Sequence, residues 1–213
     1  MSEEELFERR LTPSFFARDA LVVARALIGT YVVHVQPGGT ADATAGGEGT
    51  ARVARVVETE AYRGPTDLAC HARVGLTRRT RTLLGAPGHA YVFLIYGMYD
   101  CFNVVCHSDG RGHAVLIRAG EPVSGVGIET GVRADGPGRF ARALGITRRY
   151  DGHDLTARPL YLSARAKRPR IATSARVGVA YAGQMAEVPW RFFDAASEHV
   201  SRPSKRTIGL GVR

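Results

Sequence analysis

The sequence predicts an α+β fold with a largely antiparallel β-sheet. The chain has 213 residues, of which 45% are hydrophobic and 23% charged, so it can bury one core of ordinary size. Segments with strand-like alternation occur in clusters, and fewer segments have helical spacing. A chain that alternated regularly between strand and helix would instead favour a parallel sheet. We therefore expect one compact domain with helices packed around a sheet.

Three parts of the chain differ in character and define the expected domain boundaries. The first part is charged, the middle contains all the periodic segments, and the last is polar and typical of a frayed terminus. The predicted parts are an N-terminal extension (1–11), a domain (12–196) and a C-terminal tail (197–213).

The domain is predicted to begin with a helical region and a strand. Thr12 and Pro13 are typical of a helix start, apolar residues follow at helical spacing, and Gly29 provides a stop. A strand is expected over 30–35. The next segment, 37–50, is rich in Gly, Ala and Thr and predicts a mobile hairpin loop.

The stretch "ARVARVVETEAY" predicts a strand that carries two carboxylates on one face. Alternation with period two places Glu58, Glu60 and Tyr62 on the same side. Such a pair is often only a solvated polar face, but the apolar neighbours here indicate partial burial, and a buried carboxylate needs a cation to stay charged. Arg118, which interrupts the apolar strand "HAVLIRAGEP", is the candidate partner.

The remaining elements complete the sheet. "AYVFLIYGMYDCFNVVC" predicts two strands joined near Gly97, and a turn there should push the ring of Tyr96 outward. "GPGRFARALGI" is typical of a short helix that opens at Pro137 and ends at Gly145. Two further strands are expected around the basic turn of "LYLSARAKRPRIATS", and "VPWRFF" closes the domain.

The charge of the chain favours a polyanionic partner. The net charge is +9, and 27 of the 29 basic residues are arginine, whose planar fork matches phosphate. A solvated basic surface is the plainer alternative. The N-terminus has no apolar signal core and no segment approaches the ~18 apolar residues of a membrane span, so we expect a cytoplasmic protein without a membrane partner.

The sequence does not predict a metal site, a disulfide framework or a catalytic lysine. The three cysteines contain no CxxC pair, so we expect reduced thiols. His107 and His113 lie near Cys106 but without carboxylate or paired-cysteine spacing, so we interpret them as surface histidines and expect no metal. The two lysines, Lys167 and Lys205, stand in no motif that would support a Schiff base.

Five segments occur together in an order that resembles a known family. They are "VVETEAYRGPTDLACHA", "YVFLIYGMYDCFN", "VLIRAGEP", "GPGRFARALGI" and "RVGVAYAG". In this order they are similar to the alkyladenine (3-methyladenine) DNA glycosylases, over about residues 12–193. The resemblance implies a curved, barrel-like sheet with a protruding hairpin. It also implies a monomeric enzyme without a cofactor that flips alkylated or deaminated purines from double-stranded DNA and hydrolyses the N-glycosidic bond.

The resemblance also implies roles for individual residues. Glu60 would be the general base that activates water, Arg118 would orient that carboxylate, and Glu58 would be structural. The walls of the base pocket would be Tyr62, His71, Phe93 and Asn103. Phe93 stands where well-known members have tyrosine, so hydrogen bonds of that hydroxyl are missing.

DNA contacts are expected on the hairpin and in the arginine-rich loop. Tyr96 resembles the intercalating residue of the family and Met98 its apolar neighbour. Phosphate contacts are expected from Arg73, Arg78, Arg79 and Arg81, for which a solvated basic loop is the alternative.

Two other functions fit parts of the sequence. A catalytically silent DNA-damage-binding protein would keep the pocket and the wedge but would not need Glu60 or Arg118. A carbohydrate hydrolase could use Glu58 and Glu60 as its pair, but two carboxylates on one strand face approach a substrate from the same side rather than flanking the bond.

Overall fold

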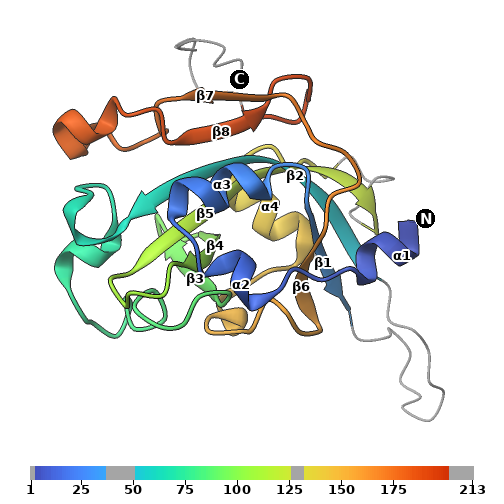
Figure 1. The fold of residues 1–213 in the computed structure, drawn as a ribbon, viewed down its shortest axis with the longest axis horizontal. Helices are drawn as coiled ribbons and strands as arrows, with labels where there is room; N and C mark the ends of the chain where they lie inside the picture. The colour runs from blue at the N-terminus through green and yellow to red at the C-terminus, as the bar shows by residue number, and fades with distance from the viewer. Residues whose placement is uncertain (1–2, 37–50, 126–131, 202–213) are drawn as a thin grey trace.

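A computed structural model describes residues 3–36, 51–125 and 132–201 (Figure 1). The α-helices are α1 (Glu3–Glu8), α2 (Pro13–Phe16), α3 (Ala20–Leu27) and α4 (Pro137–Leu144). Short 3-10 helices are η1 (Gly64–Thr66), η2 (His71–Val74), η4 (Arg148–Tyr150) and η5 (Ala180–Ala186). Among the described helices, none has the length and apolar character needed to cross a membrane.

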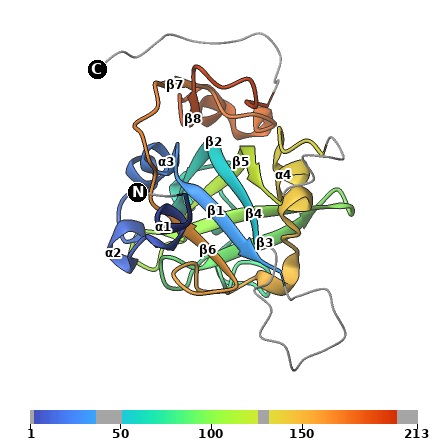
Figure 2. The same cartoon turned by 90° about the vertical axis from the view of Figure 1, so that its right-hand side faces the viewer.

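The strands form one curled antiparallel sheet. They are β1 (Tyr31–Val35), β2 (Ala51–Arg63), β3 (Ala90–Ile95), β4 (Tyr99–Cys106), β5 (His113–Ser124), β6 (Leu160–Ser163), β7 (Ile171–Ser174) and β8 (Arg191–Asp194). The order is β3-β4-β5-β2-β1-β6, and β8 pairs with β2 and β7. Figure 2 shows the sheet curling around the interior as a half-barrel. The predicted α+β fold with a curved antiparallel sheet is confirmed.

The long strand β2 has two neighbours along one edge. Its first half pairs with β1, and further along β8 pairs with Glu58, Thr59 and Glu60. On the opposite edge, the register with β5 shifts three times, so that Val123, Val57 and Arg118 in turn lie between paired positions. Such bulges re-aim side chains. The irregular stretch therefore coincides with the two glutamates that the sequence singled out.

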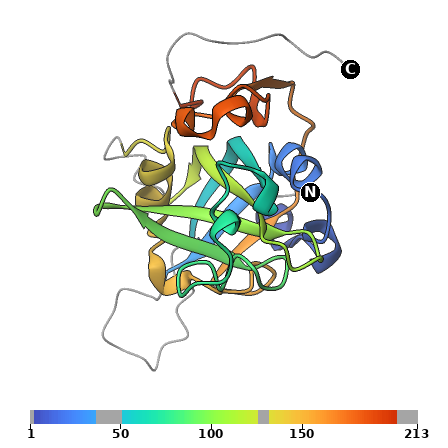
Figure 3. The same ribbon diagram turned by 90° about the vertical axis from the view of Figure 1, so that its left-hand side faces the viewer.

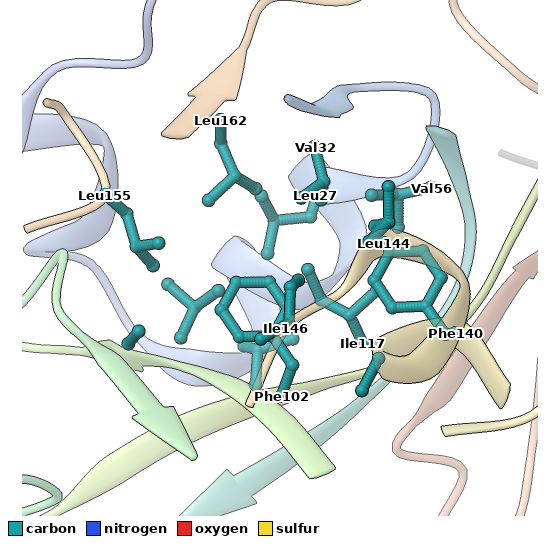
Figure 4. Packing of buried hydrophobic residues seen from close by; sticks show 14 of the residues in the cluster. Leu27, Val32, Val56, Phe102, Ile117, Phe140, Leu144, Ile146, Leu155 and Leu162 are labelled. Carbon is teal, nitrogen blue, oxygen red and sulfur yellow. The ribbon is translucent and has the colours of Figure 1, made fainter. Parts of the chain in front are cut away.

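The main core lies between the concave side of the sheet and helices α2, α3 and α4. Figure 4 shows Leu27, Phe102, Ile117 and Phe140 pointing toward one another from these elements, and all four are fully buried. Gly120 permits the close approach of α4 to β5, because a Cβ atom there would lie 2.5 Å from the ring of Phe140. This packing fixes β5, and with it Arg118, against β2.

Two expected elements differ in the structure. The helical region expected from Thr12 to Gly29 is two helices, because Asp19 accepts a hydrogen bond from the amide of Leu21 (2.8 Å) and starts a new helix. The two strands around the basic turn, β6 and β7, pair with β1 and β8 rather than with each other. The helix expected from Pro137 to Gly145 is present, as α4.

The ends of the predicted domain are tied into the fold. The amide of Leu11 donates to the carbonyl of Leu162 (2.9 Å), which fastens the predicted extension to β6. Ser201 is buried and hydrogen-bonded to Glu58, so contacts of the domain continue into the predicted tail. The expected loop at 37–50 and the tail from 202 lie outside the described residues.

The core packing leads to a stability prediction. Phe140→Ala should lower the free energy of unfolding by about 3–5 kcal/mol, because it removes a fully buried ring that fills the space beside Gly120. Urea unfolding followed by circular dichroism measures this. Val22→Ala is the matched control, since Val22 lies on α3 and is 48% exposed; its effect should stay within about 0.5 kcal/mol. Equal losses for the two variants would contradict the described packing.

Candidate active site

Glu58 is a fully buried carboxylate whose partners come from three elements. It accepts hydrogen bonds from Arg118 Nε on β5 (3.0 Å) and from Arg191 Nε on β8 (2.6 Å). The amide and hydroxyl of Ser201 donate at 2.7 and 2.8 Å. Three of these donors converge on Oε1 and one reaches Oε2. Glu58 is therefore placed to hold the chain together rather than to react.

Glu60 is also fully buried but is less completely bonded. Its Oε1 accepts from the amide of Val177 (2.7 Å) and lies 3.4 Å from Arg118 Nη1. Its Oε2 accepts from the hydroxyl of Tyr62 (2.9 Å), the hydrogen bond that the described residues give this atom. A carboxylate oxygen has two acceptor positions. Oε2 thus has room for a further donor such as water.

Glu60 raises the pKa values of the two side chains beside it, Arg118 and Tyr62. Burial alone would lower the pKa of Arg118, but Glu60 and Glu58 outweigh burial and hold that pKa above its ordinary value. Burial raises the pKa of Tyr62 well above its usual range, and the nearby Glu60 carboxylate raises it further. Arg118 is therefore a permanent cation, and the Tyr62 hydroxyl stays protonated as a donor to Glu60.

A cavity of about 250 Å³ lies beside this pair of glutamates. Four predicted residues that line it are Tyr62, His71, Phe93 and Asn103, and Arg118 lines it too. Glu60 is not a lining residue. Instead, Tyr62, Arg118 and Val177, the three residues that contact its carboxylate, all form part of the wall. The carboxylate thus lies directly behind the wall, one side chain away from the cavity.

Aromatic rings form one side of the cavity. The ring of His71 packs edge-on against Phe93, with centroids 4.6 Å apart, and Tyr91 lies 5.2 Å from Phe93. Tyr91, which the sequence reasoning did not select, supplies a hydroxyl here: its oxygen lies 2.9 Å from His71 Nδ1. Burial, and the nearby Arg79 cation, lower the pKa of His71 to about 4, so this ring is neutral at pH 7.

Polar side chains beside these rings are mostly committed to the protein. Asn103 donates from Nδ2 to the carbonyls of Tyr91 (3.0 Å) and Cys101 (3.3 Å). Burial raises the pKa of Cys70 and Cys101 to about 11 each, so both lining thiols stay protonated and are poor nucleophiles. None of the described lining residues is a lysine.

The β3–β4 hairpin projects from the domain, as Figure 3 shows. Its turn has positive φ at Tyr96 (52°) and Gly97 (71°), and the Met98 amide donates to the Ile95 carbonyl (3.2 Å). This is the pattern of a type I′ turn. Tyr96 is 83% exposed and Met98 67% exposed. The turn therefore holds two large apolar side chains in solvent, as the sequence suggested.

The four arginines of the expected DNA-contacting loop are not equivalent. Arg73, Arg78 and Arg81 are exposed and free to reach an anion, although Arg73 also donates to the Leu68 carbonyl (3.1 Å). Arg79 differs, because its guanidinium lies over the ring of Phe93 (4.8 Å) and donates weakly to His71 Nε2 (3.5 Å). Arg79 is therefore part of the cavity wall.

Sequence reasoning missed two buried arginines that support the site. Arg191 bonds Glu58, as described above. Arg176 forms a fully buried bidentate ion pair with Asp67 (2.6 and 2.8 Å), and its guanidinium stacks on Tyr62 (4.8 Å) and Trp190 (5.0 Å). Both arginines interrupt apolar strand-like segments, which is the signal that identified Arg118.

The neutral state of His71 makes stability depend on pH. Its pKa is about 4 in the folded protein and 6.5 when exposed, so between these values the unfolded chain binds more protons and acid destabilises the fold. His71→Gln should therefore lose less stability than the wild type between about pH 7 and pH 4.5. Urea unfolding at both pH values measures this. A His89→Gln variant, changed outside the cavity, should follow the wild type; identical losses in all three proteins would contradict the assignment.

Comparison with known proteins places the chain among DNA repair enzymes. The sequence model of the family described as methylpurine-DNA glycosylase (MPG) matches residues 14–198. A relative from Myxococcus xanthus is 49% identical over 194 residues, which cover 90% of this chain and 93% of the relative. Relatives from Methanocella arvoryzae (45% identical; 90% and 96% covered) and Desulfitobacterium hafniense (39%; 91% and 98%) are similar over the same extent.

All three relatives carry the name "Putative 3-methyladenine DNA glycosylase". The matched residues contain the buried glutamates, the cavity and the projecting hairpin. The family model thus covers the candidate site, apart from Ser201, as well as the sheet that carries it. The chain belongs to the methylpurine-DNA glycosylase family.

Proposed function

We propose that the protein is a monofunctional DNA glycosylase that flips alkylated or deaminated purines, such as 3-methyladenine and hypoxanthine, out of duplex DNA and hydrolyses their N-glycosidic bond. One observation carries this proposal. A buried carboxylate, Glu60, is held between an arginine and a tyrosine directly behind the wall of a ring-lined cavity. Family membership supplies the class of substrate.

In this proposal water is the nucleophile. Glu60 takes a proton from water as the oxygen attacks C1′ of the deoxyribose, and the bond from C1′ to the base breaks with its electron pair leaving on the base. An alkylated, cationic purine leaves as a neutral base, whereas hypoxanthine must gain a proton as it departs. Arg118 lies 3.4 Å from Glu60 and places a positive charge beside the proposed base. The base binds against the rings of Tyr62, His71 and Phe93, which favour an electron-poor purine.

The surface around the cavity suits a flipping enzyme. Extruding a base costs a few kcal/mol, least for a damaged or mismatched pair. An exposed ring such as Tyr96 can fill the gap left in the stack, with Met98 beside it. Arg73, Arg78 and Arg81 can bind backbone phosphates and offset the rest of the cost.

The structure favours catalysis over the two alternatives. A protein that only binds damaged DNA gains nothing from a carboxylate buried behind its pocket, since burying such a group is costly. A carbohydrate hydrolase that uses both glutamates would need both at the substrate. Three of the four donors to Glu58 come from Arg191 and Ser201, which do not line the cavity, whereas all three residues that contact the Glu60 carboxylate do.

The general base gives the most direct test. Glu60→Gln should lower the rate of base release by at least about 10²-fold, because the amide cannot accept the proton from water, while affinity for a lesion duplex stays largely unchanged. Duplexes that each carry one modified purine are incubated without added metal, and abasic sites are measured by alkaline strand cleavage. Binding is measured separately by fluorescence anisotropy.

Glu187→Gln is the control, since it changes an exposed carboxylate outside the cavity lining and should retain the wild-type rate. Near wild-type turnover by Glu60→Gln would remove Glu60 from the mechanism. If the wild-type protein binds lesion duplexes selectively but releases no base from any of them, the damage-binding alternative is correct instead.

The hairpin gives a second test. Tyr96→Ala should slow excision of hypoxanthine from a fully paired duplex by about tenfold or more, because the extruded base then leaves an empty gap in the stack. The effect should be smaller for the same base in a mismatch, which is cheaper to flip. Single-turnover rates measure both. Tyr96→Phe retains the ring and should behave as the wild type, and an unchanged rate for Tyr96→Ala would rule out the wedge.

A further inference from the structure

A cluster of two histidines and one carboxylate lies in the β4–β5 turn, outside the cavity. His107 follows β4, His113 begins β5, and Asp109 lies between them in the turn. One ligand atom from each of the three lies within 4.8 Å of the others. The sequence analysis treated both histidines as surface residues because it found no carboxylate with them. The fold corrects this: Asp109 supplies the carboxylate, and His113 is only 9% exposed.

The separations between these atoms match those of metal ligands. His107 Nδ1 lies 3.4 Å from Asp109 Oδ1, and His113 Nε2 lies 3.3 Å from Asp109 Oδ2. Two atoms that bind one tetrahedral zinc ion at about 2.05 Å are about 3.3–3.4 Å apart. These separations are longer than the usual N–H···O hydrogen bond of about 2.7–3.2 Å. The ligand atoms of all three residues lie within 4.8 Å of one another, so the cluster is compact enough to surround one ion.

The histidine nitrogens also lack other partners. His107 Nδ1 is buried and has no hydrogen bond among the described residues, and the same holds for His113 Nδ1. The two imidazole rings lie nearly parallel, with centroids 4.7 Å apart. His107 has a positive φ of 63°, which is uncommon outside glycine. Gly64 leaves room at His113, since a Cβ atom there would lie 3.1 Å from Nε2. A metal bound by His107 Nδ1 and His113 Nε2 would satisfy the unpartnered nitrogen of His107, whereas Nδ1 of His113 is not the atom that faces Asp109.

The charges nearby favour a cation over an anion. Asp19, Arg63, Asp109 and Arg111 line the depression that contains the histidines. Arg63 is already paired with Asp19 at 2.8 Å, and Asp109 lies between the two imidazoles. A phosphate in the same place would meet the Asp109 carboxylate. Two imidazoles and a carboxylate suit zinc or a similar transition metal, whereas Mg²⁺ and Ca²⁺ prefer oxygen ligands.

We propose that His107, Asp109 and His113 bind one divalent transition-metal ion, of the zinc type, in the β4–β5 turn. The three side chains leave a fourth position for water. The site lies at the opposite end of β4 from the Tyr96 hairpin, and none of its three residues lines the base cavity. Its effect would be to fasten the turn that precedes β5, and base release would not require it.

Zinc binding to the full chain tests this proposal. Protein treated with a chelator and dialysed is titrated with ZnCl₂ by calorimetry, and the melting temperature is followed in parallel. We expect one zinc per chain and a rise in melting temperature, with no response to Mg²⁺. His107→Ala and His113→Ala should each weaken zinc binding by about 100-fold or more, since each removes a direct ligand. His89→Ala, outside the cluster, should bind zinc as the wild type does.

Asp109→Asn is a second ligand variant that should fold normally, because it replaces an exposed side chain with one of the same size. It should still weaken zinc binding. Saturable binding that survives the combined loss of His107 and His113 would overturn the proposal, as would the absence of zinc binding. Stabilisation by inorganic phosphate that depends on the same histidines would show an anion site instead. Base release is assayed with and without zinc, so a failure here is separate from a failure of the glycosylase proposal.

Discussion

The candidate site depends on one guanidinium shared by two buried carboxylates. Arg118 lies 3.0 Å from Glu58 through Nε and 3.4 Å from Glu60 through Nη1, and both glutamates are fully buried. The same cation therefore serves both acidic side chains in an environment closed to solvent. Removal of one partner from such a buried group costs roughly 3–5 kcal/mol, so the arrangement holds only when it is complete.

The fold supplies the partners from segments that are distant in sequence. Glu58 takes further bonds from Arg191 on β8 and from Ser201, which lies beyond the last described strand. β8 reaches Glu58 because β1 begins at Tyr31, opposite Arg55, and leaves the edge of β2 beyond Arg55 open. The bulges that set Val57 and Arg118 between paired positions bring the two strands' side chains together at the same point. Glu58 is thus an anchor for the site.

The sequence predicts the local features of this site better than the distant ones. Alternation along β2 places both glutamates on one face, and a charge inside an apolar strand identifies Arg118, since each signal lies within a few residues. Arg191 and Arg176 carry the same signal, but their partners depend on where β8 and the loop after β7 return to the sheet. Tertiary contacts of this kind leave no pattern in the sequence. Asp109 differs, because it lies two residues after His107 and four before His113 and could have been found from the sequence.

The position of Tyr62 links the cavity to Glu60, the proposed general base. Its ring lines the cavity, its hydroxyl donates to Glu60 Oε2 at 2.9 Å, and Arg176 stacks on it at 4.8 Å. Arg176 is itself fixed by the buried Asp67, so Tyr62 has little freedom to move away from the carboxylate. Under the proposed function, a purine in the cavity would contact the same side chain that donates to Glu60. Occupation of the cavity and orientation of the Glu60 carboxylate would then be coupled through Tyr62.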